Sequence, residues 1–194
     1  MQDLLAQTVR AHGEAGHWHT LSGFRVRARV QGAIWALKGK RGLFDDITIT
    51  GETREQRLTI APYPGPGHHT TWEPRRQTIA RDDGILVTER LDPRARFASH
   101  TRQTAWDDFH AAYFAAEVLW NCLTVPFHLL RSDVHTEEGK PWHEEGASWR
   151  ALQVTYPDAF AAPSKQQTFY FGAEGLLRRI DFGFDLLGPS PAVH

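Results

Sequence analysis

The chain has only one cysteine, and this scarcity limits its redox and metal chemistry. Cys122 is the single thiol among 194 residues, so the chain can form no internal disulfide. It stands in an apolar run, where cysteine is commonly a buried and unreactive side chain. The sequence also contains no HExxH motif and no Cys/His cluster of the kind that holds zinc.

Long hydrophobic runs and a strong excess of either charge are missing too. No stretch of about 18 apolar residues could span a bilayer, and residues 1–19 show no basic region followed by an apolar one. These absences predict a cytoplasmic protein without a secretory signal or transmembrane segment. The formal net charge is -1 and the basic residues are scattered, so we expect no nucleic-acid partner.

Motifs for cofactor binding and for a catalytic serine are also absent. The sequence contains no GxGxxG or Walker motif and no G-x-S-x-G elbow. We therefore predict that the protein uses no cofactor.

Short β-type segments separated by turn residues are abundant. Residues 24–30 alternate apolar side chains with three arginines, which turns one face toward a core and the other toward water. Residues 33–38 are predicted to return as a second strand that carries Ile34, Trp35 and Leu37. Further β-type runs cover residues 46–50, 57–61, 70–73, 77–80, 85–90, 134–137 and 149–156. Turn signals about every 8–12 residues predict an antiparallel meander rather than βαβ units.

Near the C-terminus, QQTFYFGAEGLLRRIDF (residues 166–182) predicts a hairpin. Two runs rich in β-type and aromatic residues flank Gly172–Gly175, and glycine readily takes the positive φ that a short loop requires.

Two segments carry helical patterns. Residues 3–11 predict a short amphipathic helix that ends before Gly13 and Gly16. Residues 106–123, WDDFHAAYFAAEVLWNCL, predict a longer helix with Asp107 and Asp108 in its first turn, where the helix dipole favours carboxylates. Apolar residues cover most of its circumference, so it must be covered on more than one side.

These elements predict a mainly β (α+β) fold. We expect a curved antiparallel sheet, or incomplete β-barrel, wrapped around the central apolar helix, with a short N-terminal helix. The prediction is one half-barrel domain over residues 1–194.

Several stretches resemble a known family. They are AHG…HW…L (residues 11–21), the arginine-bearing opening strands, WRALQVTYP (residues 149–157) and FYFGAEGLLRRIDF (residues 169–182). In these the chain resembles the bacterial lipoprotein carriers and their half-barrel relatives. The resemblance implies an incomplete antiparallel barrel, closed by helices over an apolar cavity that holds acyl chains. It implies no catalytic residue.

Aromatic residues are the main candidates for ligand contact. Seven tryptophans are more than such a chain usually carries, and large rings on a concave sheet can either fill a core or line a slot for an apolar ligand. Both interpretations stay open. The predicted ligand-binding residues are Trp35, Trp106, Phe109, Tyr113, Trp120, Phe169 and Phe171.

Acid–base chemistry has one weak candidate pair. Asp107 and His110 lie three residues apart on the predicted helix, so the carboxylate could orient the imidazole as a general base. An ordinary helix N-terminus shows the same pair, and this interpretation is therefore the less favoured one. His128 could line the same cavity.

Our leading hypothesis is a non-enzymatic protein that binds a small hydrophobic or acyl ligand between the curved sheet and the helix. The alternative is a cofactor-free enzyme that uses the same cavity with His110 and Asp107. A second alternative is a structural or partner-binding half-barrel without a ligand.

We predict that the histidines hold no metal. His17 and His19 are separated from His68 and His69 by some fifty residues, and a metal site needs three or four converging ligands. Elemental analysis after dialysis should therefore find no stoichiometric zinc, iron or copper. One metal per chain would contradict this prediction and favour the enzyme.

Overall fold

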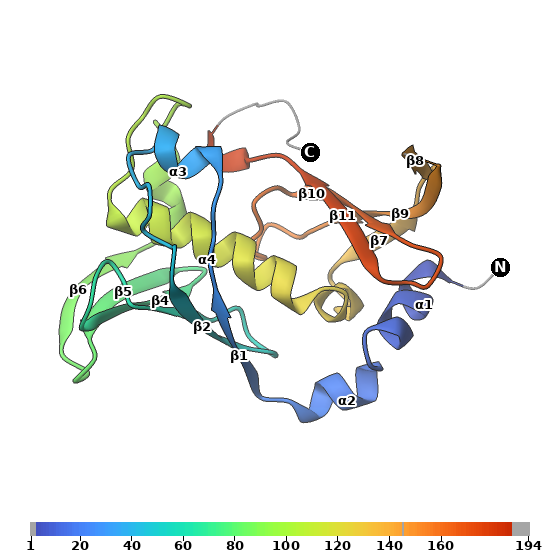
Figure 1. Ribbon diagram of the computed structural model, residues 1–194, viewed down its shortest axis with the longest axis horizontal. Helices are drawn as coiled ribbons and strands as arrows, with labels where there is room; N and C mark the ends of the chain where they lie inside the picture. Colours follow the sequence, from blue (N-terminus) through green and yellow to red (C-terminus); the bar gives the residue numbers. More distant parts are fainter. Residues whose placement is uncertain (1–2, 145, 188–194) are drawn as a thin grey trace. The chain divides into compact units, whose positions relative to one another are not determined.

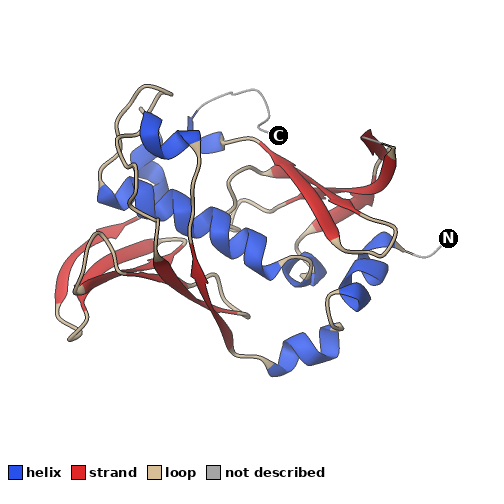
Figure 2. Ribbon diagram, viewed as in Figure 1, coloured by secondary structure: helices blue, strands red, loops and turns tan. Residues whose placement is uncertain are grey.

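A computed structural model describes residues 3–144 and 146–187 and shows a mainly β protein, with 34% strand and 26% helix (Figure 2). The chain divides into two compact units. The middle unit contains residues 22–120 and 186–187, and the terminal unit contains residues 3–21 and the described part of 121–185. The predicted mainly β, antiparallel fold is confirmed. The single half-barrel domain over residues 1–194 stays a prediction.

The middle unit contains a six-stranded antiparallel meander that is open at both edges (Figure 1). Its strands follow one another in chain order: β1 (Gly23–Ala28), β2 (Ile47–Glu52), β3 (Leu58–Ala61), β4 (His68–Glu73), β5 (Arg76–Arg81) and β6 (Leu86–Leu91). Val26 pairs with Ile49, and Thr70 pairs with Ile79. Turns and short loops join β2 to β6, as the spacing of turn residues predicted, whereas a longer segment that contains a helix joins β1 to β2.

Side-chain alternation decides which face of this sheet is buried. In β1 the arginines are exposed and the apolar residues between them are partly covered, which confirms the predicted alternation. Ile49, Ile60 and Trp72 on the central strands are buried to 1% exposure or less. The edge strand β6 differs, because Leu86, Val87 and Leu91 are 50–60% exposed.

Residues 33–38, predicted as a strand, instead form the helix α3 (Ala33–Leu37) and its C-cap. The prediction is wrong because this run is short and apolar, and its periodicity fits either element. Trp35 and Lys38 lie three residues apart on one helical face and are 6% and 0% exposed. A strand would have placed Trp35 and Leu37 on one face, whereas Leu37 is 48% exposed.

The long helix α4 (Asp108–Thr124) is covered on more than one side, as predicted. Residues 111–117 are all buried, and seven consecutive residues make about two helical turns. Tyr113 contacts Trp72 of the sheet, with ring centroids 6.1 Å apart. Phe114 instead contacts Trp35 at 5.8 Å and Trp106 at 5.0 Å. The sheet therefore covers one side of the helix, and α3 with the segment before α4 covers another.

The terminal unit contains a second antiparallel sheet in the order β11-β10-β9-β7, with β8 also paired to β9 (Figure 1). The predicted hairpin is confirmed: Phe169 pairs with Ile180, and Gly175 has a φ of 84° in the loop. Its strands are β7 (His135–Glu138), β8 (Trp142–Glu144), β9 (Ala147–Thr155), β10 (Gln166–Phe171) and β11 (Leu177–Phe182).

The helical segments of the terminal unit begin with the predicted N-terminal helix, α1 (Leu4–Ala11). A second helix, α2 (Ala15–Thr20), follows directly, although Gly16 argued against it. Tertiary packing supports α2, because Trp18 stacks on Phe127 with ring centroids 4.4 Å apart. The described residues also form three short 3-10 helices: η1 (Pro93–Phe97) in the middle unit, η2 (Phe127–Leu130) in the terminal unit, and η3 (Asp185–Leu187). In the part of the chain that the structure describes, no helix has both the length and the apolarity needed to cross a membrane.

Within the middle unit, Lys38 holds the segment before α4 next to α3 through hydrogen bonds. Its ammonium group donates to the carbonyl oxygens of Thr101, Arg102 and Thr104, at 3.0, 2.8 and 2.9 Å. It also lies 5.1 Å from the centre of the Trp106 ring. Burial lowers the pKa of Lys38, but these acceptors use all three donors of the ammonium group.

Replacing Lys38 by Met should therefore destabilise the middle unit. The substitution keeps most of the apolar stem but leaves three carbonyl groups without their donor, which should cost about 2 kcal/mol. Equilibrium unfolding in urea, followed by tryptophan fluorescence, measures the loss. Lys140→Met is the matched control, because Lys140 is exposed, and it should leave the midpoint unchanged. Equal midpoints for the two variants would contradict the assigned role of Lys38.

Candidate functional site

All seven predicted ligand-binding residues are buried. Trp35, Trp106, Phe109, Tyr113 and Trp120 belong to the middle unit and are 0–9% exposed. Phe169 and Phe171 belong to the terminal unit, and both are 0% exposed. Five of the predicted side chains are thus buried in the middle unit and two in the terminal unit.

In the middle unit, Phe97 of η1 joins several of the predicted rings. Its ring centroid lies 5.9 Å from that of Trp106, 5.8 Å from that of Tyr113 and 4.8 Å from that of His110. Sequence reasoning missed Phe97, because it stands in a short irregular segment with no periodic pattern. Trp120 is held differently, since its indole N–H donates to the Glu52 carbonyl oxygen at 3.0 Å.

Polar groups also reach this aromatic interior. Glu117 is 0% exposed and forms an ion pair with Arg94 of η1. Burial raises the pKa of Tyr113, and the nearby Glu117 carboxylate raises it further, whereas Arg94 and Trp72 lower it. Among the described residues, neither the Tyr113 hydroxyl nor the Trp72 indole nitrogen has a partner in hydrogen-bond geometry. Both groups therefore lie close to the Glu117–Arg94 ion pair within an aromatic interior.

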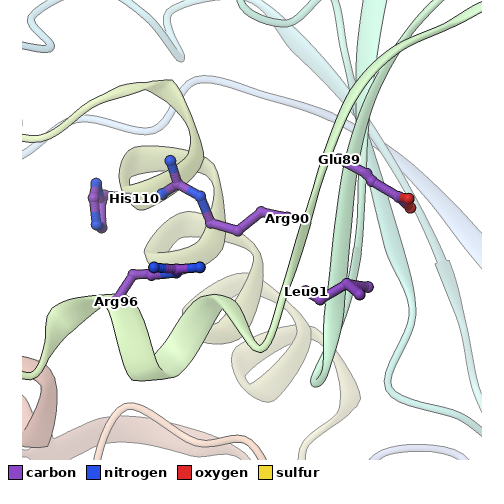
Figure 3. Close-up of a pocket in the computed structure, with 5 residues that line it drawn as sticks. All are labelled: Glu89, Arg90, Leu91, Arg96 and His110. Atoms are coloured by element: carbon purple, nitrogen blue, oxygen red, sulfur yellow. The ribbon is translucent and has the colours of Figure 1, made fainter.

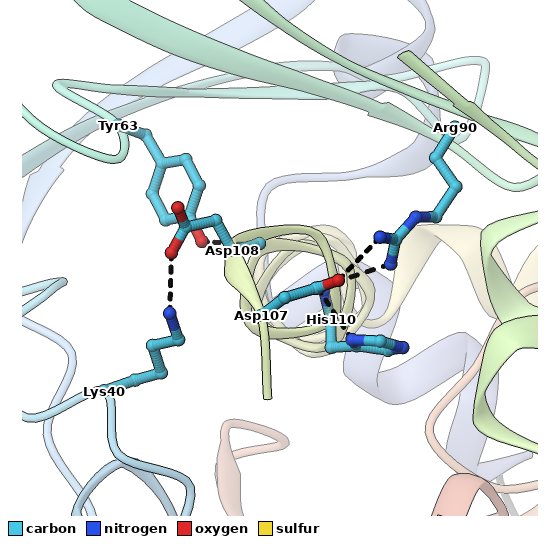
Figure 4. A network of polar contacts seen from close by, with 6 residues as sticks. All are labelled: Lys40, Tyr63, Arg90, Asp107, Asp108 and His110. Carbon is cyan, nitrogen blue, oxygen red and sulfur yellow. Dashed lines mark hydrogen bonds and ion pairs between the residues drawn. The ribbon is translucent and has the colours of Figure 1, made fainter. Parts of the chain in front are cut away.

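The structure brings Asp107 and His110 together at the start of α4 (Figure 4). The Asp107 carboxylate accepts from the His110 backbone N–H at 2.8 Å, as an N-cap residue does. The same oxygen lies 2.7 Å from His110 Nδ1, but this approach lacks hydrogen-bond geometry. Arg90 of β6 forms an ion pair with Asp107 at 2.6 Å. The carboxylate is thus shared between a helix cap, an imidazole and a guanidinium.

The neighbouring Asp108 fixes the other side of the helix start. Its carboxylate forms an ion pair with Lys40 at 2.6 Å, and its backbone oxygen accepts from the Tyr63 hydroxyl (Figure 4). Both carboxylates of the first turn therefore have cationic partners from other segments of the middle unit, in addition to the favourable helix dipole.

Burial governs the titration of this cluster. Burial lowers the pKa of His110, and His100 and Arg90 lower it further, against the opposing effects of Asp107 and the Arg96 backbone. The pKa of His100, whose ring lies 4.3 Å from that of His110, is also lowered, mainly by burial. Burial raises the pKa of Asp107, but the bonds from Arg90 and His110 outweigh it and the net shift is downward. At neutral pH the site thus combines a carboxylate with neutral imidazoles.

An open depression of about 620 Å³ lies beside this cluster. Glu89, Arg90 and Leu91 of β6, Arg96 of η1 and His110 of α4 line it (Figure 3). Figure 3 shows the Arg90 side chain pointing toward the side where His110 lies and the Arg96 side chain pointing toward Arg90, while Glu89 points away. Spacing predicted only the Asp107–His110 pair, since both arginines come from other elements.

His128 belongs to the terminal unit and is 5% exposed. Its Nδ1 lies 3.0 Å from the Thr124 hydroxyl and its Nε2 lies 2.8 Å from the Tyr156 hydroxyl, which also accepts from Asn121 at 3.3 Å. Burial lowers the pKa of His128 to about 3. The imidazole therefore stays neutral inside a satisfied hydrogen-bond network. Next to Asn121 in sequence, burial raises the pKa of Cys122 to about 11, as expected for an unreactive thiol.

Among the described histidines, the two pairs considered as metal ligands lie in separate units. His17 and His19 lie on the helix α2 rather than on an extended segment, and His68 and His69 open β4 rather than a loop. The described residues contain no group of three or more His, Cys, Asp or Glu side chains that could hold a metal ion.

No protein-family model matches the chain, and no curated protein or solved structure matches it either. The resemblance to bacterial lipoprotein carriers therefore stays a hypothesis drawn from the sequence. Function has to be inferred from the side chains themselves.

The buried imidazole of His128 predicts a pH-dependent stability. The unfolded chain binds a proton at an ordinary histidine pKa of 6.5, whereas the folded chain binds it only near pH 3. Below pH 6.5 the free energy of unfolding should thus fall by up to about 1.4 kcal/mol per pH unit because of this group alone.

The comparison of wild type with His128→Gln isolates that contribution. Urea unfolding at pH 7, 6 and 5 should give a steeper fall for the wild type than for the variant, whatever the absolute stability of the variant. Parallel pH dependences for the two proteins would contradict the assigned neutral state of His128.

Proposed function

We propose that the protein binds a small hydrophobic or acyl ligand in the middle unit, between α4 and the six-stranded sheet. The ligand has an apolar body and at least one oxygen acceptor, such as an acyl carbonyl or carboxyl group. The aromatic side chains around Tyr113 suit the apolar body by their area and shape.

The observation that carries this proposal is a pair of buried groups, Trp72 Nε1–H and Tyr113 O–H, neither of which has a partner in good hydrogen-bond geometry among the described residues. Trp72 and Arg94 lie close enough to the Tyr113 hydroxyl to lower its pKa, but neither offers it an acceptor. Both residues are 0% exposed, and their rings contact each other at 6.1 Å. A buried donor without an acceptor costs about 1–3 kcal/mol, so proteins rarely keep two together. A ligand oxygen that accepts from either donor recovers this energy. Binding then requires the aromatic wall to open, since the rings are packed in the described structure.

Tyr113→Phe tests the proposal, because it removes only the hydroxyl group. The free variant should be as stable as the wild type or more stable, by up to about 1 kcal/mol, because a buried unsatisfied donor is lost. The affinity for a fluorescent fatty acid should fall roughly fivefold to tenfold, the equivalent of one lost hydrogen bond. Urea unfolding and fluorescence titration measure the two effects on the same protein.

Tyr63→Phe is the matched control in the same unit. The Tyr63 hydroxyl donates to the Asp108 carbonyl oxygen, so its removal should lower stability by about 1 kcal/mol and leave the affinity for the probe unchanged. The ligand proposal fails if Tyr113→Phe loses stability as this control does and the probe binds both variants as it binds the wild type. The structural or partner-binding protein without a ligand is then the better description.

A cofactor-free enzyme is the second candidate, and the Asp107–His110 geometry favours it. A neutral imidazole with a carboxylate 2.7 Å from Nδ1 is the pair that a general base uses, and it would act through Nε2. Here the approach lacks hydrogen-bond geometry and both ring nitrogens are buried, so catalysis would require the pair to open and realign. The ion pair from Arg90 makes the carboxylate a weaker partner for that imidazole. This candidate requires His110, whereas ligand binding beside Tyr113 does not, and His110→Gln separates the two.

A further inference from the structure

We propose that the depression lined by Arg90, Arg96 and His110 is a binding site for a small oxyanion, a carboxylate or a phosphate. The site lies on the surface of the middle unit, and the inference stands independently of the ligand proposed for the interior.

The charges around the depression favour an anion. Arg96 is exposed and makes no ion pair with any described residue, so its guanidinium group is available. Arg90 gives two of its five N–H donors to Asp107, and its side chain is 21% exposed. Glu89 points away from His110 and forms an ion pair with Arg76 at 2.9 Å (Figure 3). Two guanidinium groups and the Glu89 carboxylate line the depression, and Glu89 is already paired with Arg76, as Asp107 is with Arg90. The charge of Arg96 therefore leaves the depression net positive.

The two arginines are also held differently, which suits recognition. Arg90 is fixed by Asp107 and lies over the Phe109 ring, with its guanidinium carbon 4.5 Å from the ring centroid. Arg96 projects from η1, where the buried side chains of Pro93 and Phe97 anchor the backbone. A planar guanidinium group binds carboxylate or phosphate oxygens through paired N–H donors. One fixed and one adjustable arginine can thus close on an oxyanion from two sides.

In this site His110 donates no hydrogen bond to the anion, but its pKa responds to the charge of the anion. Both ring nitrogens lie below the surface, while the ring itself forms part of the wall. The charged and titratable groups that face it are Asp107 of the helix start, Arg90 of β6 and His100 after η1. A bound anion adds negative charge to this set and stabilises the imidazolium form. Bound anion therefore raises the pKa of His110, and affinity increases as the pH falls through that pKa.

The site can be tested on the whole chain by NMR titration with sodium acetate and, separately, with sodium phosphate, at constant ionic strength set by sodium chloride. The Arg96 Nε–H and His110 ring signals should shift and saturate with at least one of the two anions. Saturation by acetate alone identifies a carboxylate site, and saturation by phosphate alone identifies a phosphate site. The pKa of His110 should be higher in the saturated protein than in chloride.

Arg96→Gln should weaken binding roughly tenfold or more, because it removes a charged donor pair. The variant should keep its fold, because Arg96 makes no ion pair with a described residue and the substitution therefore removes none. Arg75→Gln is the control: Arg75 is 91% exposed, its side chain lies 3.6 Å from Asp92, and it is not one of the lining residues, so affinity should be unchanged. Shifts that grow linearly with either anion, as with chloride, overturn the proposal. An unchanged affinity in Arg96→Gln does so too.

Discussion

The middle unit depends on the burial of α4 around its whole circumference. Residues 111–117 leave no exposed stripe, so the helix cannot lie on a surface and needs partners on every side. The six-stranded sheet, α3 and the segment before α4 supply these partners. Because such a helix has no solvent-exposed face, a charged side chain on it is stable only with a partner of opposite charge. Glu117 has Arg94, and Asp107 and Asp108 have Arg90 and Lys40.

This constraint explains why the titratable groups gather at the start of the helix. The first turn is where backbone N–H groups and the helix dipole favour carboxylates, and it is also where the covering segments end. His110 lies one turn inside, beneath Phe97, and is desolvated enough to stay neutral. One border of the depression follows from the same arrangement, because Arg90 neutralises Asp107 at the helix start.

Much of the fold could be predicted from the sequence, because alternation and turn residues are local signals. The meander, the C-terminal hairpin and both predicted helices follow from them. The helix α3 could not be predicted, since its five apolar residues fit a helix or a strand equally well. Its conformation depends on the hydrogen bonds from Lys38 to the carbonyl groups of Thr101, Arg102 and Thr104, which are distant in sequence. For the site, spacing predicted the Asp107–His110 pair. Phe97, Arg90 and Arg96 come from elements that only the tertiary fold brings to α4.

The Phe97 ring contacts residues of both proposed sites, so a movement of this ring affects both. Tyr113 and His110 lie three residues apart on α4, and the Phe97 ring contacts both of them, at 5.8 and 4.8 Å. Phe97 also belongs to the same short helix as Arg94 and Arg96. An apolar ligand that enters beside Tyr113 must displace packed rings, and a shift of Phe97 changes the desolvation of His110 and the position of Arg96. If both proposed sites bind their ligands, we expect the two binding events to be coupled, and by linkage each ligand then changes the affinity of the other by the same factor.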